Sequence, residues 1–187
     1  MPIQTLISSA GLVLLMELGD KTMLTTICLS AQYRRPWLVL LATMVALATS
    51  SVIAVIIGYI LSATLPIEII TYVSGILFIV LGIYTLATSN SDIPDTCDNP
   101  GTMFGMFSLV LLSELGDKSQ ITILALAAQT PFAIMVFAGS LIGFLVVNAI
   151  GAFAGNRVAA RIPLKIVKKV VGLIFVLFGG LIVLGIL

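Results

Sequence analysis

Two copies of one short charged motif hold the residues that could do chemistry in this sequence. The first copy, ELGDKT, occupies residues 17–22, and the second, ELGDKS, occupies residues 114–119. Apolar sequence flanks both, although an ionisable side chain near the centre of a membrane helix costs about 2.5–3.5 kcal/mol. Such side chains face the interior of a helix bundle and pair with one another. We therefore expect the two copies to meet inside the protein.

The charges of the two copies do not cancel. The charged residues are Glu17, Asp20, Lys21, Glu114, Asp117 and Lys118. Four carboxylates and two ammonium groups leave a net charge of −2, which one divalent cation or two protons would neutralise. The motif predicts a site where a metal ion and protons compete for the same carboxylates. Inert ion pairs that lock the bundle are the alternative, but a lock has no use for uncompensated negative charge in lipid.

Spacing along a helix brings the charged residues of each copy together. Glu17, Asp20 and Lys21 are separated by three and four residues, which predicts one shared helix face, and the second copy has the same spacing. Gly19 and Gly116 lie in the middle of the two motifs. We expect a kink or local unwinding at each glycine, which would expose backbone carbonyls to the ion. Strong tilt of the two long segments that contain the motifs is the plainer alternative.

The ligands that the motif offers are oxygen atoms. We expect the four carboxylates to bind the cation, with support from the side chains of Thr22, Thr25, Ser119, Gln120 and Thr122. The chain has no histidine. Oxygen ligands favour Ca²⁺, Mg²⁺ and Mn²⁺ over Zn²⁺ or Cu⁺.

The composition is that of a membrane protein. The chain of 187 residues is 60% hydrophobic and 9% charged, with a mean hydropathy of +1.24 and a net charge of +1. Because a soluble domain carries about 25% charged residues, a soluble globular protein is excluded. The lack of a basic surplus excludes nucleic-acid binding. The sequence predicts an all-α integral membrane protein in contact with lipid.

Six apolar segments are long enough to cross a membrane as helices, which takes about 20 residues. They cover residues 4–31, 37–61, 67–88, 102–130, 132–154 and 165–187. Loops with proline or charged residues separate most of them. The motif copies fall in the first and fourth segments.

The chain contains an internal repeat with an offset of 97 residues, since LVLLMELGDKT at 12–22 returns as LVLLSELGDKS at 109–119. Further matched pairs are Gly58 and Gly155, Pro66 and Pro163, Gly75 and Gly172, Phe78 and Phe175, and Gly82 and Gly179. Each copy holds three spans, and an odd number inverts the second copy in the membrane. We predict two inverted three-helix repeats, 1–88 and 102–187, joined by an acidic linker, 89–101, with the site where the repeats meet.

Basic residues predict the orientation. Two lie in the loop 32–36 and five in the segment 155–169, whereas the loops at the opposite face have none. Under the positive-inside rule, these basic loops and the acidic linker are cytoplasmic. Both termini are then extracytoplasmic.

The two motifs resemble those of the GDT-type cation/proton exchanger family, which has Glu-x-Gly-Asp-(Lys/Arg)-(Ser/Thr) in the first and fourth of six spans. That family includes the Golgi manganese transporter of eukaryotes, chloroplast relatives and bacterial manganese exporters. ELGDKT at 17–22 and ELGDKSQ at 114–120 match its pattern, although Leu115 stands where the second motif often has an aromatic residue. The resemblance implies movement of Mn²⁺, and in some members Ca²⁺, against H⁺. It also implies that the cation site consists of Glu17, Asp20, Glu114 and Asp117.

We therefore expect a secondary active transporter that exchanges Mn²⁺ for protons across a bacterial cytoplasmic (inner) membrane, as an exporter. An exchanger of Ca²⁺ or another divalent cation is one alternative. An intramembrane enzyme and a structural membrane subunit are others. No protease or phosphotransferase pattern lies outside the motifs, so we expect neither enzymatic activity nor a cofactor, with the divalent cation as substrate. The sequence is also compatible with a homodimer.

Overall fold

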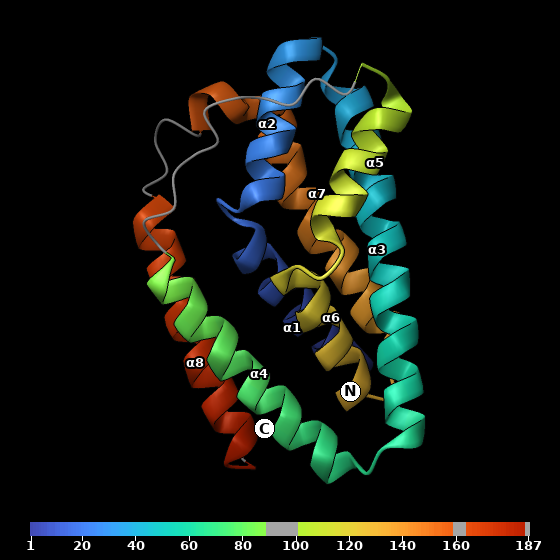
Figure 1. Cartoon of the computed structure of the whole chain (residues 1–187), viewed down its shortest axis with the longest axis vertical. Coiled ribbons are helices and arrows are strands. Elements are labelled where there is room, and N and C mark those ends of the chain that lie inside the picture. Colours follow the sequence, from blue (N-terminus) through green and yellow to red (C-terminus); the bar gives the residue numbers. More distant parts are fainter. Residues whose placement is uncertain (89–100, 159–163, 186–187) are drawn as a thin grey trace.

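Every regular element that the structure describes is an α-helix, which agrees with the all-α prediction. The computed structural model describes residues 1–88, 101–158 and 164–185, so the predicted linker lies almost wholly outside the described residues. The helices are α1 (Pro2–Glu17), α2 (Lys21–Tyr33), α3 (Pro36–Thr64), α4 (Ile67–Ala87), α5 (Met103–Glu114), α6 (Lys118–Gln129), α7 (Ala133–Val158) and α8 (Leu164–Val183). Figure 1 shows them as one elongated bundle.

Three of the described helices are long and apolar enough to cross a membrane, judged by length and composition. They are Pro36–Thr64, Ile67–Ala87 and the Ala133–Phe153 part of α7. Shorter apolar helices cover Pro2–Glu17, Met103–Glu114 and Lys169–Val183. The shortness of α1 and α5 has a local cause, because each of the two motif-bearing segments is divided into two helices.

The division falls at the two motif glycines. α1 ends at Glu17 and α2 begins at Lys21, while α5 ends at Glu114 and α6 begins at Lys118. Gly19 has φ 75° and Gly116 has φ 83°, in the left-handed region that glycine adopts without a steric penalty. The interruption expected at these glycines is confirmed.

The same interruption makes one expectation wrong. Glu17 and Lys21 belong to different helices, so a spacing of four residues does not place them on one helix face. A helix face exists only where the backbone keeps 3.6 residues per turn, and the left-handed glycine ends that regularity. The charged residues of each copy are therefore positioned by a turn and two helix ends.

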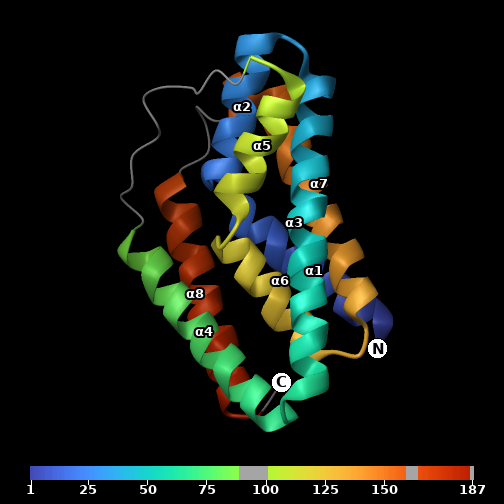
Figure 2. The ribbon, with the colours of Figure 1, turned by 45° about the vertical axis from the view of Figure 1, so that its right-hand side comes forward.

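Helices from the two halves of the sequence pack against each other in matching pairs. α1 packs on α7, and the helix at the equivalent place in the second half, α5, packs on α3. Likewise α2 packs on α7, and α6 packs on α3. Figure 2 shows α4 and α8 side by side as an antiparallel pair at one flank of the bundle. These pairings interleave the two halves.

Glycines allow the closest of these approaches. A Cβ placed on Gly75 would lie 3.1 Å from the carbonyl oxygen of Gly179, and one placed on Gly82 would lie 2.7 Å from that of Gly172. On the other side of the bundle, a Cβ on Gly143 of α7 would lie 2.8 Å from the carbonyl oxygen of Ala10 in α1. Small residues at helix contacts let backbones approach in this way.

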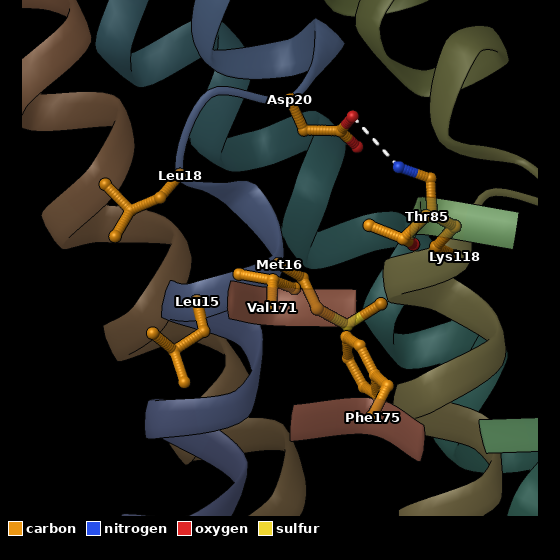
Figure 3. A pocket seen from close by; sticks show the side chains of 8 residues that line it. All are labelled: Leu15, Met16, Leu18, Asp20, Thr85, Lys118, Val171 and Phe175. Atoms are coloured by element: carbon orange, nitrogen blue, oxygen red, sulfur yellow. Dashed lines mark hydrogen bonds and ion pairs between the residues drawn. The ribbon is translucent and has the colours of Figure 1, made fainter. Parts of the chain in front are cut away.

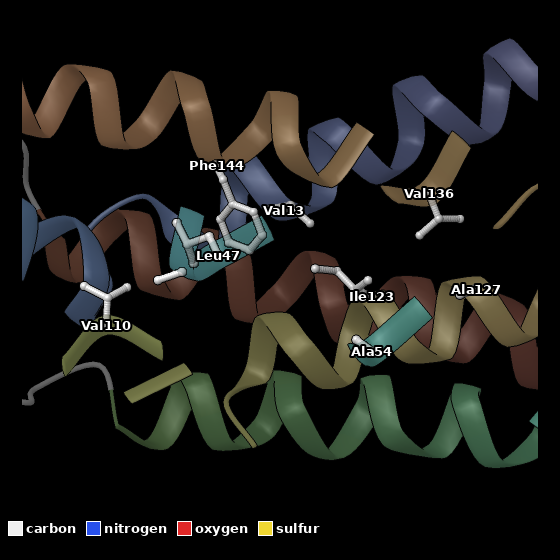
Figure 4. Close-up of a cluster of buried hydrophobic side chains, with 9 residues drawn as sticks. Val13, Leu47, Ala54, Val110, Ile123, Ala127, Val136 and Phe144 are labelled. Carbon is white, nitrogen blue, oxygen red and sulfur yellow. The ribbon is translucent and has the colours of Figure 1, made fainter. Parts of the chain in front are cut away.

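Apolar side chains from five helices fill the centre of the bundle. The cluster contains Val13, Ala46, Leu47, Ala54, Val110, Ile123, Ala127, Val136 and Phe144, all buried (Figure 4). Val13 of α1 and Val110 of α5 are repeat counterparts, and both are fully buried. A second cluster, which includes Met16 of α1 and Phe175 of α8, joins the α4–α8 pair to the bundle. The ends of α1 and α5 are thereby fixed inside the protein.

The two ends of the bundle contain different connections. Figure 1 places both chain termini at the same end as the α3–α4 and α6–α7 connections, and the α2–α3 connection at the other. The charged residues Arg34 and Arg35 lie in the α2–α3 connection. The predicted orientation depends on the basic residues at one end of the bundle, which the positive-inside rule assigns to the cytoplasm.

Candidate cation site

The two motif glutamates lie at the C-terminal ends of two short helices, in the interior of the protein. Glu17 is the last residue of α1 and is fully buried, and Glu114 is the last residue of α5 and is 2% exposed. The two aspartates lie at the opposite side of each turn. Asp20 is the N-cap residue of α2, and Asp117 is the N-cap residue of α6.

Three of the four carboxylates come together. Glu17, Glu114 and Asp117 each offer one carboxylate oxygen, and these three atoms lie within 4.8 Å of one another. The group joins residues from both halves of the sequence. Three oxygens at this separation can coordinate a single divalent cation after a small approach, since Ca²⁺ and Mg²⁺ bind oxygen at about 2.0–2.6 Å. The fourth carboxylate, that of Asp20, is not part of this group.

Hydroxyl groups hold one glutamate of the three. Thr22 of α2 donates a hydrogen bond to one carboxylate oxygen of Glu114, and Ser119 of α6 donates to the other at 3.0 Å. Both hydroxyl residues are buried. Charge-assisted hydrogen bonds of this kind fix the orientation of a carboxylate as well as stabilising it. The carboxylate of Glu114 is therefore held in a fixed orientation, in part by the other half of the sequence.

The second glutamate, Glu17, has different surroundings. Among the described residues, neither carboxylate oxygen of Glu17 has a hydrogen-bond partner. A buried carboxylate that lacks a partner is costly, and natural proteins keep such groups where a ligand, an ion or a proton completes them. The geometry leaves Glu17 free to receive a cation or a proton.

A lysine from the second half holds the remaining aspartate. The Nζ atom of Lys118 lies 3.0 Å from Oδ1 of Asp20, and both side chains are largely buried, at 22% and 16% exposure. Lys21, at the equivalent position of the first half, is exposed and has no ion pair with a described residue. The two lysines, which have the same place in the motif, therefore have different surroundings.

The other predicted supporting residues fall into two groups. Gln120 lies at the broken helix, where its Oε1 accepts a hydrogen bond from the backbone N–H of Gly116. Thr25 is half-buried on α2, while Thr122 is fully buried on α6 and its hydroxyl has no hydrogen-bond partner among the described residues. The structure brings Thr22 and Ser119 to a motif carboxylate, and it shows no such contact for Thr25 or Thr122.

Two contacts near the motif were not predicted. The N–H of Gly19 donates to the sulfur of Met23 at 3.3 Å, which is the counterpart of the Gly116–Gln120 contact. The hydroxyl of Thr26 donates to Oδ1 of Asn148 at 2.8 Å and joins α2 to α7. The repeat offset could have indicated the first contact, because Met23 and Gln120 are repeat counterparts. No feature of the sequence indicated the contact of Thr26, since its partner Asn148 lies on a distant helix.

A small pocket lies beside the ion pair of Asp20 and Lys118. It is lined by residues of α1, α4, α6 and α8 and of the turn before α2, namely Leu15, Met16, Leu18, Asp20, Thr85, Lys118, Val171 and Phe175 (Figure 3). Figure 3 shows the pair on one side of this group of side chains, with Met16 and Phe175 below it in the view. The ion pair is therefore part of the lining of this pocket.

Comparison with known proteins identifies related sequences along nearly the whole chain. The family model described as divalent cation/proton antiporter GDT1 matches residues 5–93 and 102–186. A GDT1-like protein of Synechocystis is 32% identical over 194 residues, which cover 91% of this chain and 93% of that protein. No solved structure matches this chain.

Two further relatives have names that describe a function. A Vibrio cholerae protein, provisionally named a manganese exporter, is 28% identical over 166 residues, covering 88% of this chain and 83% of that protein. The divalent cation/proton antiporter GDT1 of Saccharomyces cerevisiae is 23% identical over 232 residues, covering 94% of this chain and 82% of that protein.

Proposed function

This chain belongs to the GDT1 family of divalent cation/proton antiporters, and on that premise we propose that it exchanges Mn²⁺ for protons across a bacterial cytoplasmic membrane, as an exporter. The observation that carries the proposal is the meeting of Glu17, Glu114 and Asp117 within 4.8 Å, deep in an apolar bundle. Oxygen ligands suit Mn²⁺. The name of the Vibrio cholerae relative supports manganese as the substrate.

The proposed site contains all four motif carboxylates. Glu17 and Glu114 bind the cation together with Asp117, or with Asp20 when Lys118 releases it. Thr22 and Ser119 keep Glu114 in position. Because the cation and protons need the same oxygens, one displaces the other, which couples the two fluxes. Calcium is the second candidate substrate, since every donor of the group is an oxygen atom.

The proposed membrane arrangement has six crossings. In it, α1 with α2 forms one crossing and α5 with α6 forms another, while α3, α4, α7 and α8 each form one. The two halves, 1–88 and 102–187, are inverted repeats, and the matching helix pairs support this symmetry. The end of the bundle that contains Arg34 and Arg35 is cytoplasmic, and the termini are extracytoplasmic.

Flux in proteoliposomes tests the proposed function. Purified protein is reconstituted into vesicles, a pH gradient is imposed, and Mn²⁺ and Ca²⁺ uptake are followed together with internal pH. We expect Mn²⁺ movement that depends on the gradient and an opposite proton movement. The matched control is the Glu17→Gln variant, which keeps the shape of the side chain and removes its charge. Equal flux in protein-free vesicles, or in vesicles with this variant, would reject the proposal.

A further inference from the structure

The two turns that interrupt the helices are repeat counterparts, yet their surroundings differ. In the first turn, Leu18 is half-buried and Gly19 is buried. In the second turn, Leu115 is 46% exposed and Gly116 is also exposed. A chain with two equivalent turns has thus closed one of them and left the other open.

The ion pairs follow the same division. Lys118 of the second half pairs with Asp20 of the first, at 3.0 Å. The counterpart of this pair, between Lys21 and Asp117, is not formed, because Lys21 is exposed and Asp117 lies with the two glutamates instead. The closed turn is therefore the one whose aspartate is held by a lysine.

We propose that Lys118–Asp20 and Lys21–Asp117 are alternative ion pairs, of which one is closed at a time, and that they give the cation site access from opposite sides of the membrane. The proposal rests on the proposed function and adds to it a gate on each side. Each lysine takes the place of the cation's charge at one aspartate while the other aspartate serves the site.

The pocket beside the closed pair supports this assignment. Lys118 and Asp20 lie at one edge of a pocket between α1 and the α4–α8 pair (Figure 3). In the proposal, separation of the two side chains opens a route from the pocket to the carboxylates, which the pair closes in the present arrangement. We assign the other route to the second turn, because Leu115 and Gly116 are exposed.

The internal repeat explains how the two arrangements can have similar free energies. The helix contacts come in matching pairs, with α1 on α7 and α5 on α3. A change that exchanges the roles of the halves forms on one side the contacts that it breaks on the other. A modest interaction then suffices to move the equilibrium, because a ligand or mutation shifts it only by its differential effect on the two states.

Cysteine labelling tests the proposal with two reporter positions and two matched lysine variants. Leu18→Cys and Leu115→Cys report the first and second turns, and each is combined with Lys118→Met or Lys21→Met. A membrane-permeant maleimide is applied to protein in liposomes, and the modified cysteine is located by mass spectrometry, which separates the reporter from the native cysteines. Mn²⁺ flux is measured on the same preparations.

We expect Leu115→Cys to react readily and Leu18→Cys slowly when both lysines are present. Lys118→Met should speed labelling of Leu18→Cys and slow that of Leu115→Cys, by about fivefold for an interaction of ordinary strength. Lys21→Met should slow labelling of Leu18→Cys and speed that of Leu115→Cys. Two lysines that only stabilise the fold would change both reporters in one direction.

The outcomes separate the two proposals. Equal shifts in both lysine variants, no shift in either, or an unreactive Leu115→Cys would overturn the alternative ion pairs, even if Mn²⁺ flux is normal. Opposite shifts in a protein that moves no divalent cation would support the two arrangements and reject the proposed function alone.

Discussion

Phe78 of α4 stacks on Phe175 of α8, with ring centroids 5.6 Å apart and ring planes 13° apart. The two residues occupy the same position in the two halves of the sequence, 97 residues apart. A residue that contacts its own counterpart marks the place where a two-fold axis between the halves would pass. The neighbouring glycines are consistent with the same axis, since Gly75 meets Gly179, the counterpart of Gly82, and Gly82 meets Gly172, the counterpart of Gly75.

A methyl group at this helix contact should separate α4 from α8. In Gly179→Ala the new Cβ would lie 2.6 Å from the carbonyl oxygen of Gly75, so the backbones must move, at a cost of about 1–3 kcal/mol. Gly180→Ala is the matched control, because its Cβ would meet nothing within 4 Å. Thermal unfolding in detergent should show a lower midpoint for the first variant only. Equal midpoints would contradict the tight contact.

Neutral replacements of the four carboxylates should stop transport without preventing membrane insertion. The variants are Glu17→Gln, Asp20→Asn, Glu114→Gln and Asp117→Asn, and each removes one charged ligand and one proton acceptor. Glu68→Gln is the control, since Glu68 lies exposed in the first turn of α4. Mn²⁺ flux per inserted protein is the measurement. Wild-type flux in any two of the four variants would rule out a shared site.

The hydroxyl of Thr22 should strengthen cation binding through Glu114. Thr22→Val keeps the shape and removes a hydrogen bond to a carboxylate, which is worth about 1.5–3 kcal/mol. We expect the apparent Kd for Mn²⁺ to rise by about tenfold or more. Thr49→Val serves as the control, because the exposed Thr49 hydroxyl donates only to the carbonyl of Val45 in its own helix. An unchanged Kd in Thr22→Val would show that this hydroxyl does not contribute to cation binding.

The apparent affinity for Mn²⁺ should increase with pH. A proton on a site carboxylate must leave before the metal can use that oxygen, so a lower proton concentration favours the metal. If two protons leave for each cation, the Kd falls by up to about a hundredfold per pH unit while the acids titrate. Calorimetric titration of the detergent-solubilised protein with Mn²⁺ over a pH series measures this change in Kd. A Kd that is independent of pH would break the link between metal and proton binding.

The two ends of the bundle should face opposite sides of the membrane. Cysteines placed at Thr102, before α5, and at Ala63, near the end of α3, should react with an impermeant maleimide from opposite sides. Both positions are exposed in the structure. The positive-inside rule assigns Thr102 to the cytoplasm. Labelling of both from one side would contradict the inverted repeat.

Much of the architecture is readable from the sequence, because the signals are local. Apolar segments long enough to span a membrane predict helices, and the observed helices follow the predicted boundaries within a few residues. The glycine in the middle of each motif predicts a break, because glycine adopts a left-handed backbone without a penalty. The break appears at Gly19 and Gly116. The three acidic residues that lie together, Glu17, Glu114 and Asp117, all belong to the predicted cation site.

The partners within the site were decided by tertiary structure alone. Spacing along the chain favoured contacts of Glu17 with Lys21 inside one copy of the motif, but the broken helix separates these residues. Lys118 instead reaches Asp20, and Thr22 reaches Glu114, both across the two halves. Such contacts depend on how helices cross, which no short segment encodes.

The difference between the two halves could not be predicted from the sequence either. The motifs are nearly identical, so the sequence predicts two equivalent turns and two equivalent lysines. The folded chain nevertheless buries Gly19 and exposes Gly116, and it pairs Lys118 with Asp20 while Lys21 stays exposed. Local sequence signals were enough to predict the helices, their breaks and the chemistry of the motif. Only the packing of one half against the other decided which carboxylates meet, because a contact between distant segments forms at the free-energy minimum of the whole bundle.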